Sequence, residues 1–265
     1  MTTARADSLN SPQSPHSPQV RFFALIPCAG LGSRAGTPLP KQYQLIAGKP
    51  LVFHTLSAFA AVKRLDKTLV VVAPGDCFFG EPATDQAFEV TDCGGASRAD
   101  SVFNGLQALR LAGALNDDWV LVHDAARCLV TPAQIDRLID ACAGDAVGGL
   151  LALKLPDTLK READGRVAGT VDRADKWLAQ TPQMFRLGAL AAALAEAFDG
   201  AGDGITDESS AMEAMGLQPK LVAGSAENFK VTYAEDFWLA EAILLGRRDR
   251  LHREPTPELL NPAER

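Results

Sequence analysis

A glycine-rich loop with two nearby cations is the part of this sequence best suited to phosphate chemistry. The loop, residues 27–34 (Pro-Cys-Ala-Gly-Leu-Gly-Ser-Arg), ends in Arg34 and is soon followed by Lys41. Because glycine lets backbone N–H groups approach an anion closely, such a loop can hold phosphate oxygens. Phosphorus gains negative charge during phosphoryl or nucleotidyl transfer, so Arg34 and Lys41 are candidate catalytic residues. The spacing also fits a plain glycine turn flanked by solvated cations, and it matches neither the dinucleotide fingerprint nor the P-loop.

Three further polar residues stand where either chemistry or structure could explain them. Asp124 follows an apolar run, and ligands of open α/β sheets bind beyond the carboxyl ends of the strands. Its carboxylate could hold a metal ion or a substrate hydroxyl, or it could cap the next turn. We interpret His123 as structural, because a phosphate monoester is already an anionic nucleophile near pH 7. Ser101 could recognise a pyrimidine edge or cap a helix.

Apolar runs alternate with helical patterns over most of the chain. The apolar runs occupy residues 22–26, 68–73, 119–123 and 146–153. The helical patterns occupy residues 54–62, 101–111 and about 131–141, the last opened by Thr131 as cap and Pro132 as first helical residue. Because strands that are apolar throughout need cover on both faces, the pattern predicts an α/β, Rossmann-like, mostly parallel sheet with helices on both faces.

A polar stretch at about 154–176 interrupts this alternation. It contains Asp164-Gly165, a dipeptide typical of tight hairpin turns, so it predicts a projecting β-arm. An isolated hairpin is marginally stable in water, so we expect the arm to pack on a second subunit. Later helices are expected at 187–198, 209–215 and 234–245. The last of them is expected to start with a capping box formed by Thr232 and Glu235.

The composition limits the class of protein. With 265 residues, 47% of them hydrophobic, the chain can bury a sizeable core. We expect one domain over 20–246, between a disordered Ser-Pro leader (1–19) and a flexible charged tail (247–265). The net charge of −7 argues against a nucleic-acid partner, and no apolar run reaches the ~20 residues that span a membrane. Five cysteines without C-x-x-C spacing, and no signal-peptide pattern, favour a cytoplasmic protein with reduced thiols.

Short motifs recur in a recognisable order along residues 22–245. They begin with Ala29-Gly30-Leu31-Gly32-Ser33-Arg34, Pro40-Lys41-Gln42-Tyr43 and His54-Thr55-Leu56. They continue at 94–102 (GGASRADSV), 122–127 (VHDAAR), 157–160 (DTLK), 181–183 (TPQ), 206–208 (TDE) and 228–232 (NFKVT). In this order the motifs resemble the 2-C-methyl-D-erythritol 4-phosphate cytidylyltransferase family of non-mevalonate isoprenoid biosynthesis. One departure is Cys128, where the family usually has proline, and it bears on the placement of Arg127.

The resemblance implies an activity and a role for each matched residue. The activity is transfer of CMP from CTP to 2-C-methyl-D-erythritol 4-phosphate, giving 4-diphosphocytidyl-2-C-methyl-D-erythritol and pyrophosphate, with a divalent metal, usually Mg²⁺. Arg34 and Lys41 would stabilise the transition state. CTP binding is assigned to Ala29, Gly30, Gly32, Gly95, Arg98 and Ser101. Binding of the sugar-alcohol phosphate is assigned to Asp124, Arg127, Thr158, Arg173, Thr181 and Lys230, with Asp124 also a candidate metal ligand.

The resemblance also implies a homodimer, because the family's arm reaches into the neighbouring subunit's site. From the residues alone, Arg173 would be an ordinary solvated arginine on a hairpin. Three alternative functions stay open at this point. A related pyrimidine nucleotidyltransferase acting on ribitol 5-phosphate would share the nucleotide loop, and a non-catalytic nucleotide sensor would bind CTP without releasing pyrophosphate. A dinucleotide-dependent dehydrogenase is disfavoured, because the third glycine of its fingerprint is replaced by Ala35.

Overall fold

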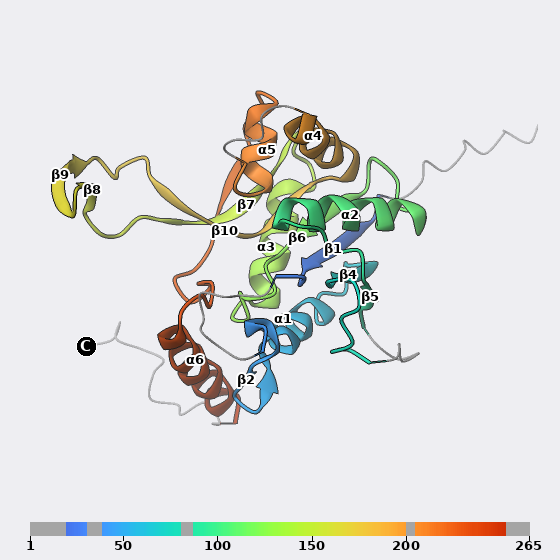
Figure 1. Ribbon diagram of the computed structural model, residues 1–265, viewed down its shortest axis with the longest axis horizontal. Coiled ribbons are helices and arrows are strands. Elements are labelled where there is room, and N and C mark those ends of the chain that lie inside the picture. The colour runs from blue at the N-terminus through green and yellow to red at the C-terminus, as the bar shows by residue number, and fades with distance from the viewer. Residues whose placement is uncertain (1–19, 31–38, 81–86, 200–204, 253–265) are drawn as a thin grey trace, which may run out of the picture.

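A seven-stranded sheet forms the centre of the described part of the chain (Figure 1). The computed structural model describes residues 20–30, 39–80, 87–199 and 205–252. The strand order is β11-β7-β10-β6-β1-β4-β5. The strands are β1 (Phe22–Pro27), β4 (Lys67–Val71), β5 (Glu89–Thr91), β6 (Trp119–Val122), β7 (Gly148–Lys154), β10 (Trp177–Arg186) and β11 (Lys220–Ala223). Neighbouring strands are parallel except where β10 pairs with β6 and β7, so the predicted mostly parallel sheet is confirmed.

Helices cover both faces of this sheet. One face carries α1 (Leu51–Ala60) and α3 (Pro132–Cys142), and the other carries α2 (Arg98–Leu111), α4 (Leu187–Asp199) and α5 (Glu208–Ala214). Successive residues of β1 divide between the two cores: Ala24 and Ile26 face α1 and α3, whereas Phe23 and Leu25 face the other layer. This two-sided burial is the reason why the central strands are apolar throughout.

Strand β10 lies inside the sheet, although its sequence does not predict a central strand. It contains Pro182, which lacks the N–H group that a ladder requires. The sheet accommodates this residue because the pairing of β10 with β7 is irregular between Ala179 and Gln183. The sequence patterns also miss the short strands β5 and β11 at the two edges.

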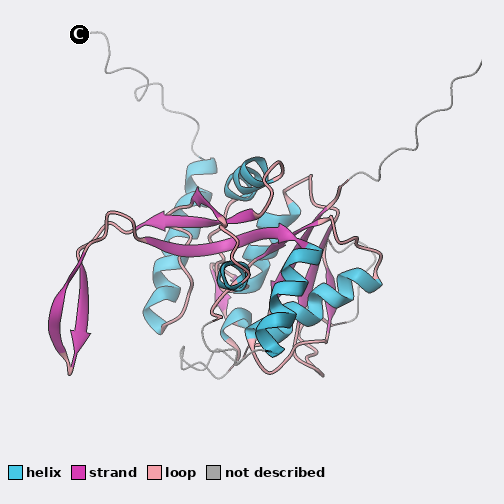
Figure 2. Ribbon diagram, turned by 90° about the horizontal axis from the view of Figure 1, so that it is seen from above, coloured by secondary structure: helices cyan, strands magenta, loops and turns pink. Residues whose placement is uncertain are grey.

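Two long strands leave the sheet together and carry the arm (Figure 2). β7 and β10 remain paired as far as Lys154 and Trp177, and the chain beyond them forms the hairpin of β8 (Leu159–Ala163) and β9 (Arg166–Val171). Asp164 and Gly165 form the tip with φ angles of 52° and 74°, the positive values that a type I′ turn needs. The predicted β-arm is therefore present, and it projects from the body with mostly exposed side chains.

A smaller layer packs beside the sheet. It contains the one-turn helix η2 (Lys41–Tyr43), strands β2 (Leu45–Ile46) and β3 (Lys49–Pro50), and helix α6 (Ala234–His252). Residues of β2 and α6 contribute to a third apolar cluster that includes Cys128, Leu129 and Val231. Cys128 is 2% exposed, and burial raises the pKa of its thiol to about 12. The residue that replaces the family's usual proline thus acts as a small apolar core residue.

Capping side chains define where two of the helices begin. In α3, the hydroxyl of Thr131 accepts the N–H of Gln134, as predicted. In α6 the prediction is wrong: Asp236, rather than Glu235, accepts the N–H groups of the two residues before the helix, at 2.7 and 2.8 Å. The reason is that the helix begins at Ala234, which places Asp236 at the third helical position, from which a side chain reaches back to the cap.

Helix α6 also extends beyond the expected end of the ordered domain. The tail was predicted from residue 247, but Arg247 donates to the carbonyl of Leu129 at 2.9 Å and pairs with Glu227 at 2.6 Å. These contacts hold the last turns of the helix, which ends at His252. Within the described residues, no helix is both long and apolar enough to cross a membrane.

Candidate functional site

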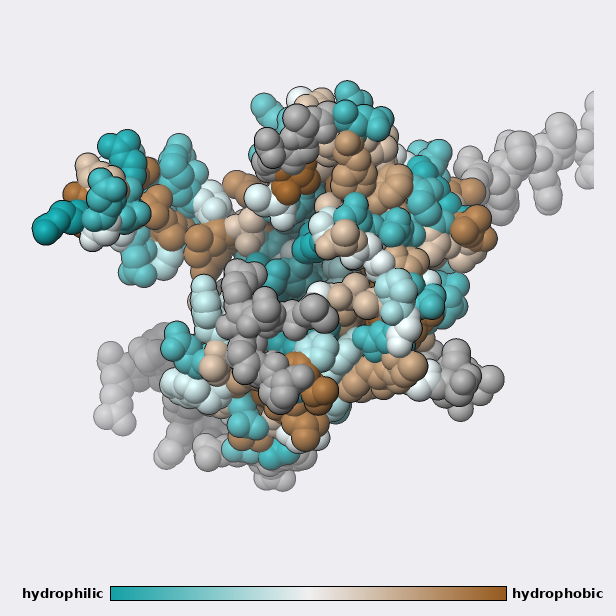
Figure 3. All heavy atoms as spheres, in the orientation of Figure 1, coloured by the Kyte–Doolittle hydropathy of each residue, from teal (hydrophilic) through white to brown (hydrophobic). Residues whose placement is uncertain are grey.

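A cavity of about 430 Å³ opens at the carboxyl edge of the sheet, where β1 and β6 end. Ligands of open α/β sheets bind at this edge. Hydrophilic side chains gather in a hollow near the middle of the face drawn in Figure 3. Eight of the predicted site residues line the cavity: Ala29, Gly30, Lys41, Gly95, Arg98, Ser101, Asp124 and Lys230.

The other predicted site residues lie elsewhere. Arg127 and Thr181 lie behind the cavity, Thr158 and Arg173 lie on the arm, and Gly32 and Arg34 fall outside the described residues. On the arm, the guanidinium of Arg173 contacts the carbonyl of Pro156, and both Thr158 and Arg173 are exposed. The arm projects away from the body (Figure 2), and neither Thr158 nor Arg173 lines the cavity of its own chain.

Gly94 and Gly95 let the chain pass very close to neighbouring residues beside the cavity. A Cβ atom on Gly94 would lie 2.6 Å from a backbone carbonyl oxygen, and one on Gly95 would lie 2.3 Å from the Cβ of Asp100. The hydroxyl of Ser101 accepts the N–H of Gly95 at 3.0 Å. Ser101 thus shapes this loop, and the proposed helix-capping role belongs instead to Ser97.

Lys41 and Lys230 face the same cavity from different segments. Lys41 lies on η2, and its Nζ donates to the carbonyl of Val231 at 2.8 Å. Lys230 directly precedes Val231, and its Nζ lies 3.0 Å from Oδ2 of Asp124. Two ammonium groups separated by more than 180 residues in sequence are in this way tied to one short segment before α6. Such a pair provides positive charge for a phosphate chain.

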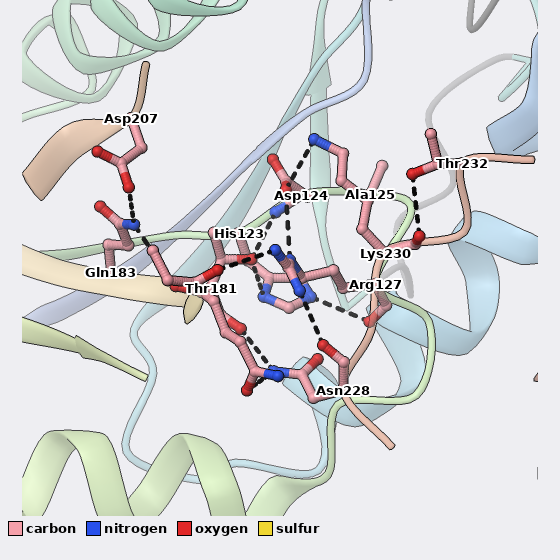
Figure 4. A network of polar contacts seen from close by, with 12 residues as sticks. His123, Asp124, Ala125, Arg127, Thr181, Gln183, Asp207, Asn228, Lys230 and Thr232 are labelled. Atoms are coloured by element: carbon pink, nitrogen blue, oxygen red, sulfur yellow. Dashed lines mark hydrogen bonds and ion pairs between the residues drawn. The ribbon is translucent and has the colours of Figure 1, made fainter. Parts of the chain in front are cut away.

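Asp124 is the centre of the polar network drawn in Figure 4. Its Oδ1 accepts from Nε of Arg98 at 2.8 Å, and its Oδ2 lies 3.0 Å from Lys230 and 3.4 Å from Arg127. Burial alone would raise the pKa of this carboxyl, but the three cations together hold it well below its usual range. Asp124 is therefore a carboxylate at neutral pH, and it orients cations that would otherwise repel one another.

Glu208 is a site residue to which the sequence reasoning assigned no role. Its two carboxylate oxygens accept from the two terminal nitrogens of Arg98, at 2.6 and 3.0 Å, and its side chain is only 1% exposed. Burial would lower the pKa of Arg98, but Glu208 and Asp124 raise it, so the guanidinium stays charged. The motif at 206–208 contains Glu208. An acidic residue at the start of a buried helix needs a cationic partner, and this requirement is the sequence signal that could have identified its role.

The residues on either side of Glu208 are fixed by a side chain of β10. The amide of Gln183 donates to Asp207 at 2.8 Å (Figure 4), and it accepts the N–H of Ser209 at 2.7 Å. Asp207 caps α5 by accepting the N–H of Ser210 at 2.9 Å. The predicted motifs at 181–183 and 206–208 are thus adjacent in space, and together they position the partner of Arg98.

His123 and Thr181 form a buried support beneath Asp124. The hydroxyl of Thr181 accepts the N–H of Asp124 at 3.1 Å and lies 2.9 Å from Nδ1 of His123. The other ring nitrogen of His123 lies 3.2 Å from the carbonyl of Arg127. Burial lowers the pKa of His123 to about 3, so the ring is neutral. This geometry fits the structural role expected for His123. Thr181 was expected to bind substrate, but its hydroxyl already contacts the N–H of Asp124 and the ring of His123.

Arg127 joins three segments behind the cavity. Besides Asp124, its guanidinium donates to the carbonyl of Asn228 at 2.8 Å and to that of Ala179 at 3.3 Å. Asn228 in turn donates from its side chain to the carbonyl of Thr181 at 2.9 Å. The side chain of Arg127 is 13% exposed, and these contacts fix its guanidinium behind the cavity.

The protein groups around Asp124 do not form a dedicated metal site. Each oxygen of this carboxylate already has a cationic partner, and the nearby Glu208 is paired with Arg98. Within the described residues, no group of three His, Cys, Asp or Glu side chains could hold a metal ion. Asp124 therefore fits poorly as a metal ligand in this arrangement.

Comparisons with known proteins identify the family of this chain. The family model described as 2-C-methyl-D-erythritol 4-phosphate cytidylyltransferase matches residues 22–246. The chain belongs to this cytidylyltransferase family. A protein of that name from Chromobacterium violaceum is 56% identical over 85% of this chain and 99% of the relative. A solved structure of 4-diphosphocytidyl-2C-methyl-D-erythritol synthase, 40% identical, superposes with a TM-score of 0.75 over 86% of this chain and all of the other.

Another relative is longer than this chain. The "Bifunctional enzyme IspD/IspF" of Albidiferax ferrireducens is 68% identical over 89% of this chain, but the match spans only 55% of that protein. This chain therefore spans about half the length of that relative.

The buried neutral His123 predicts a pH-dependent stability. An unfolded histidine has a pKa of about 6.5, so below that pH the unfolded state binds a proton that the folded state excludes. Stability is therefore present above about pH 6.5 and is lost as the pH falls toward the folded value of about 3. From pH 7 to pH 5 we expect this group to lower the free energy of unfolding by about 2 kcal/mol.

Urea unfolding of the wild type and of His123→Asn at both pH values measures this contribution. The variant, which has no group titrating at this position, should lose about 2 kcal/mol less than the wild type over the same interval. Equal losses for the two proteins would show that His123 is not held neutral.

Proposed function

We propose that this enzyme transfers CMP from CTP to 2-C-methyl-D-erythritol 4-phosphate, giving 4-diphosphocytidyl-2-C-methyl-D-erythritol and pyrophosphate. The observation that supports this most directly is that the family's motifs, far apart in sequence, line one cationic cavity at the carboxyl edge of the sheet. No observation favours the ribitol 5-phosphate alternative. The cytoplasmic location expected from the sequence stays a prediction.

The nucleotide is proposed to occupy the side of the cavity formed by the loop after β1 and the start of α2. Ala29 and Gly30 would lie against the triphosphate and base, with Gly32 completing the loop. Gly95 and Ser101 would recognise the cytosine edge, and Arg98, held by two carboxylates, would face the nucleotide with a fixed direction. Backbone groups and a hydroxyl suit a small pyrimidine whose edge has both donors and acceptors.

The reaction we propose is an in-line displacement at the α-phosphorus of CTP. A phosphate oxygen of the second substrate forms the new P–O bond while the bond to the pyrophosphate oxygen breaks, and pyrophosphate leaves with that electron pair. Lys41 and Arg34 would stabilise the negative charge that develops on the α-phosphate oxygens. No general base is required, and this agrees with a His123 that is neutral and buried beneath the site.

The divalent cation is proposed to arrive with the nucleotide. Mg²⁺ typically binds phosphate oxygens together with one or two carboxylates, and it would neutralise charge on the triphosphate. Since Asp124 is already paired with cations, the protein's contribution here is to bind and orient the phosphates through Lys41, Lys230 and Arg98.

The second substrate is proposed to bind between Asp124 and the arm of a neighbouring subunit. Lys230 would contact its phosphate and Asp124 its hydroxyl groups, while Thr158 and Arg173 would come from the partner's arm. This arrangement is supported by the exposure of both arm residues and by the exposed apolar side chains Val167, Trp177 and Leu178 along the arm. Arg127 and Thr181 are proposed to act mainly by holding Asp124 and the segment that precedes α6.

A pyrophosphate-release assay tests the proposed activity. With CTP and Mg²⁺, we expect kcat/KM for 2-C-methyl-D-erythritol 4-phosphate to exceed that for ribitol 5-phosphate by about 100-fold or more, because the site's polar groups would be left unpaired by the wrong acceptor. A preference for ribitol 5-phosphate would overturn the substrate assignment. Tight CTP binding without pyrophosphate release from any acceptor would instead indicate a nucleotide sensor.

Mixing two inactive variants tests the composite site. Lys41→Ala removes a cation from the cavity and Arg173→Ala removes one from the arm, so in a mixed dimer one site has both defects and the other has none. After subunit exchange in an equal mixture, we expect activity to return to about a quarter of the wild-type value, since half the dimers are mixed. Arg166→Ala, another exposed arginine of the arm, should be active without mixing.

The mixing result is informative only with confirmed exchange, which native mass spectrometry of isotopically labelled chains measures. No recovery in a mixture that contains mixed dimers would show that Arg173 does not complete the partner's site.

A further inference from the structure

The one-turn helix η2 that carries Lys41 has little stability of its own. It contains only Lys41, Gln42 and Tyr43, and the residue at its N-cap is Pro40, whose side chain makes no capping hydrogen bond. Short 3₁₀ turns have poor hydrogen-bond geometry, so their position is set by what they pack against. The place of the Lys41 ammonium group therefore depends on the neighbours of the other two residues.

Gln42 ties η2 to the nucleotide loop. Its side-chain amide donates to the carbonyl of Cys28 at 2.9 Å and to that of Gly30 at 2.8 Å, and the residue is 5% exposed. One amide group thus fixes the spacing between the loop after β1 and the turn that carries Lys41. Both segments line the same cavity.

Tyr43 ties the other side of η2 to the connection between β4 and β5. Its hydroxyl donates to Oδ2 of Asp76 at 2.6 Å and accepts from the thiol of Cys28 at 3.9 Å. Its ring stacks on Phe78 with a centroid distance of 3.7 Å and an interplanar angle of 9°. Burial, together with these partners, raises the pKa of Tyr43, so the hydroxyl remains a donor.

Asp76 organises both contacts of the Tyr43 side chain. While its Oδ2 accepts from the Tyr43 hydroxyl, its Oδ1 accepts the N–H of Phe78 at 2.9 Å and so holds the residue on which the tyrosine ring stacks. Phe79 packs edge-on against Phe78 at a centroid distance of 5.2 Å, and Phe53 packs edge-on against Phe79 at 5.7 Å. The contact is thus part of a packed aromatic cluster outside the cavity, and a carboxylate far from the chemistry determines where η2 lies.

We propose that Tyr43, held by Asp76, is a positioning residue for Lys41. A lysine side chain has several rotatable bonds, and placing its ammonium group at a reacting phosphate requires a fixed backbone from which it extends. Displacement of a catalytic group by about 1 Å can cost about 100-fold in rate. The inference rests on the proposed function, because it assigns Lys41 to the transition state.

The substitution Tyr43→Phe tests it, since it keeps the ring and its stacking and removes only the hydroxyl. We expect kcat to fall about tenfold, with the KM for CTP changed less than about threefold, because a transition-state contact is weakened. Tyr233→Phe, the same change at the other tyrosine of the chain, which is 54% exposed, should leave kcat unchanged. In a Lys41→Ala background, Tyr43→Phe should change the residual rate less than about twofold.

Two kinetic results would overturn the proposal. One is an unchanged kcat in Tyr43→Phe, and the other is a tenfold loss that persists in the Lys41→Ala background, which would mean that Tyr43 acts independently of Lys41. A wild-type protein without turnover is instead a failure of the proposed function.

The chemical reactivity of Lys41 tests the positioning role even if the wild-type protein shows no turnover. The rate at which an amine-specific reagent acylates Lys41, followed by peptide mass spectrometry against the exposed Lys63 as internal standard, should rise several-fold in Tyr43→Phe. An unchanged relative rate would contradict the positioning role whether or not the enzyme turns over.

Discussion

A single buried carboxylate, Asp124, accepts contacts from Arg98, Arg127 and Lys230, and the rest of the site depends on this cluster. Taking a carboxylate and several cations out of water is costly, and the cost is offset only when the geometry and hydrogen bonding are complete. Here they are: the backbone N–H of Asp124 is bound by Thr181, and Arg98 has Glu208 as a second partner. The cations are thus held in place before any phosphate binds, which is the arrangement that electrostatic catalysis requires.

The fold supplies each member of this cluster from a different element. Asp124 follows β6, Thr181 lies on β10, Glu208 begins α5, and Lys230 precedes α6. The strand order places β10 directly beside β6, so the antiparallel strand brings Thr181 next to Asp124. The same strand continues outward toward the arm, so one element links the residues that support Asp124 to the surface proposed to serve a neighbouring subunit.

How much of this could be predicted from the sequence differs between the sheet and the site. Strands buried on both faces, such as β1 and β6, are apolar throughout, and the Asp164-Gly165 turn specifies its hairpin locally, so both were predictable. Strand β10 could not be predicted from the sequence. Proline is unfavourable in a central strand, and the irregular pairing that accommodates Pro182 is known only from the structure. Which acid caps α6 depended on the first residue of that helix, a boundary that the sequence pattern leaves open by a residue or two.

Residues of a motif that line the cavity could be predicted as site residues from the sequence. Residues that act by holding another residue in place could not. The resemblance assigned roles to Lys41, Asp124 and Lys230, and all three line the cavity. Glu208 lay within a matched motif, yet its role follows only from its contact with Arg98, which is more than 100 residues away in the chain. Thr181 was expected to touch substrate, but its hydroxyl is turned to the backbone of Asp124 and to His123.

The most direct test of this account is the effect of Asp124→Asn on kcat/KM for pyrophosphate release with 2-C-methyl-D-erythritol 4-phosphate. The amide keeps the size of the side chain but removes the negative charge shared by three cations, of which Arg98 still has Glu208 as a partner. If the carboxylate holds these cations for catalysis, kcat/KM should fall by about 100-fold or more, which corresponds to a loss of about 2.7 kcal/mol of transition-state stabilisation. A value within about threefold of the wild type would contradict the central role of Asp124.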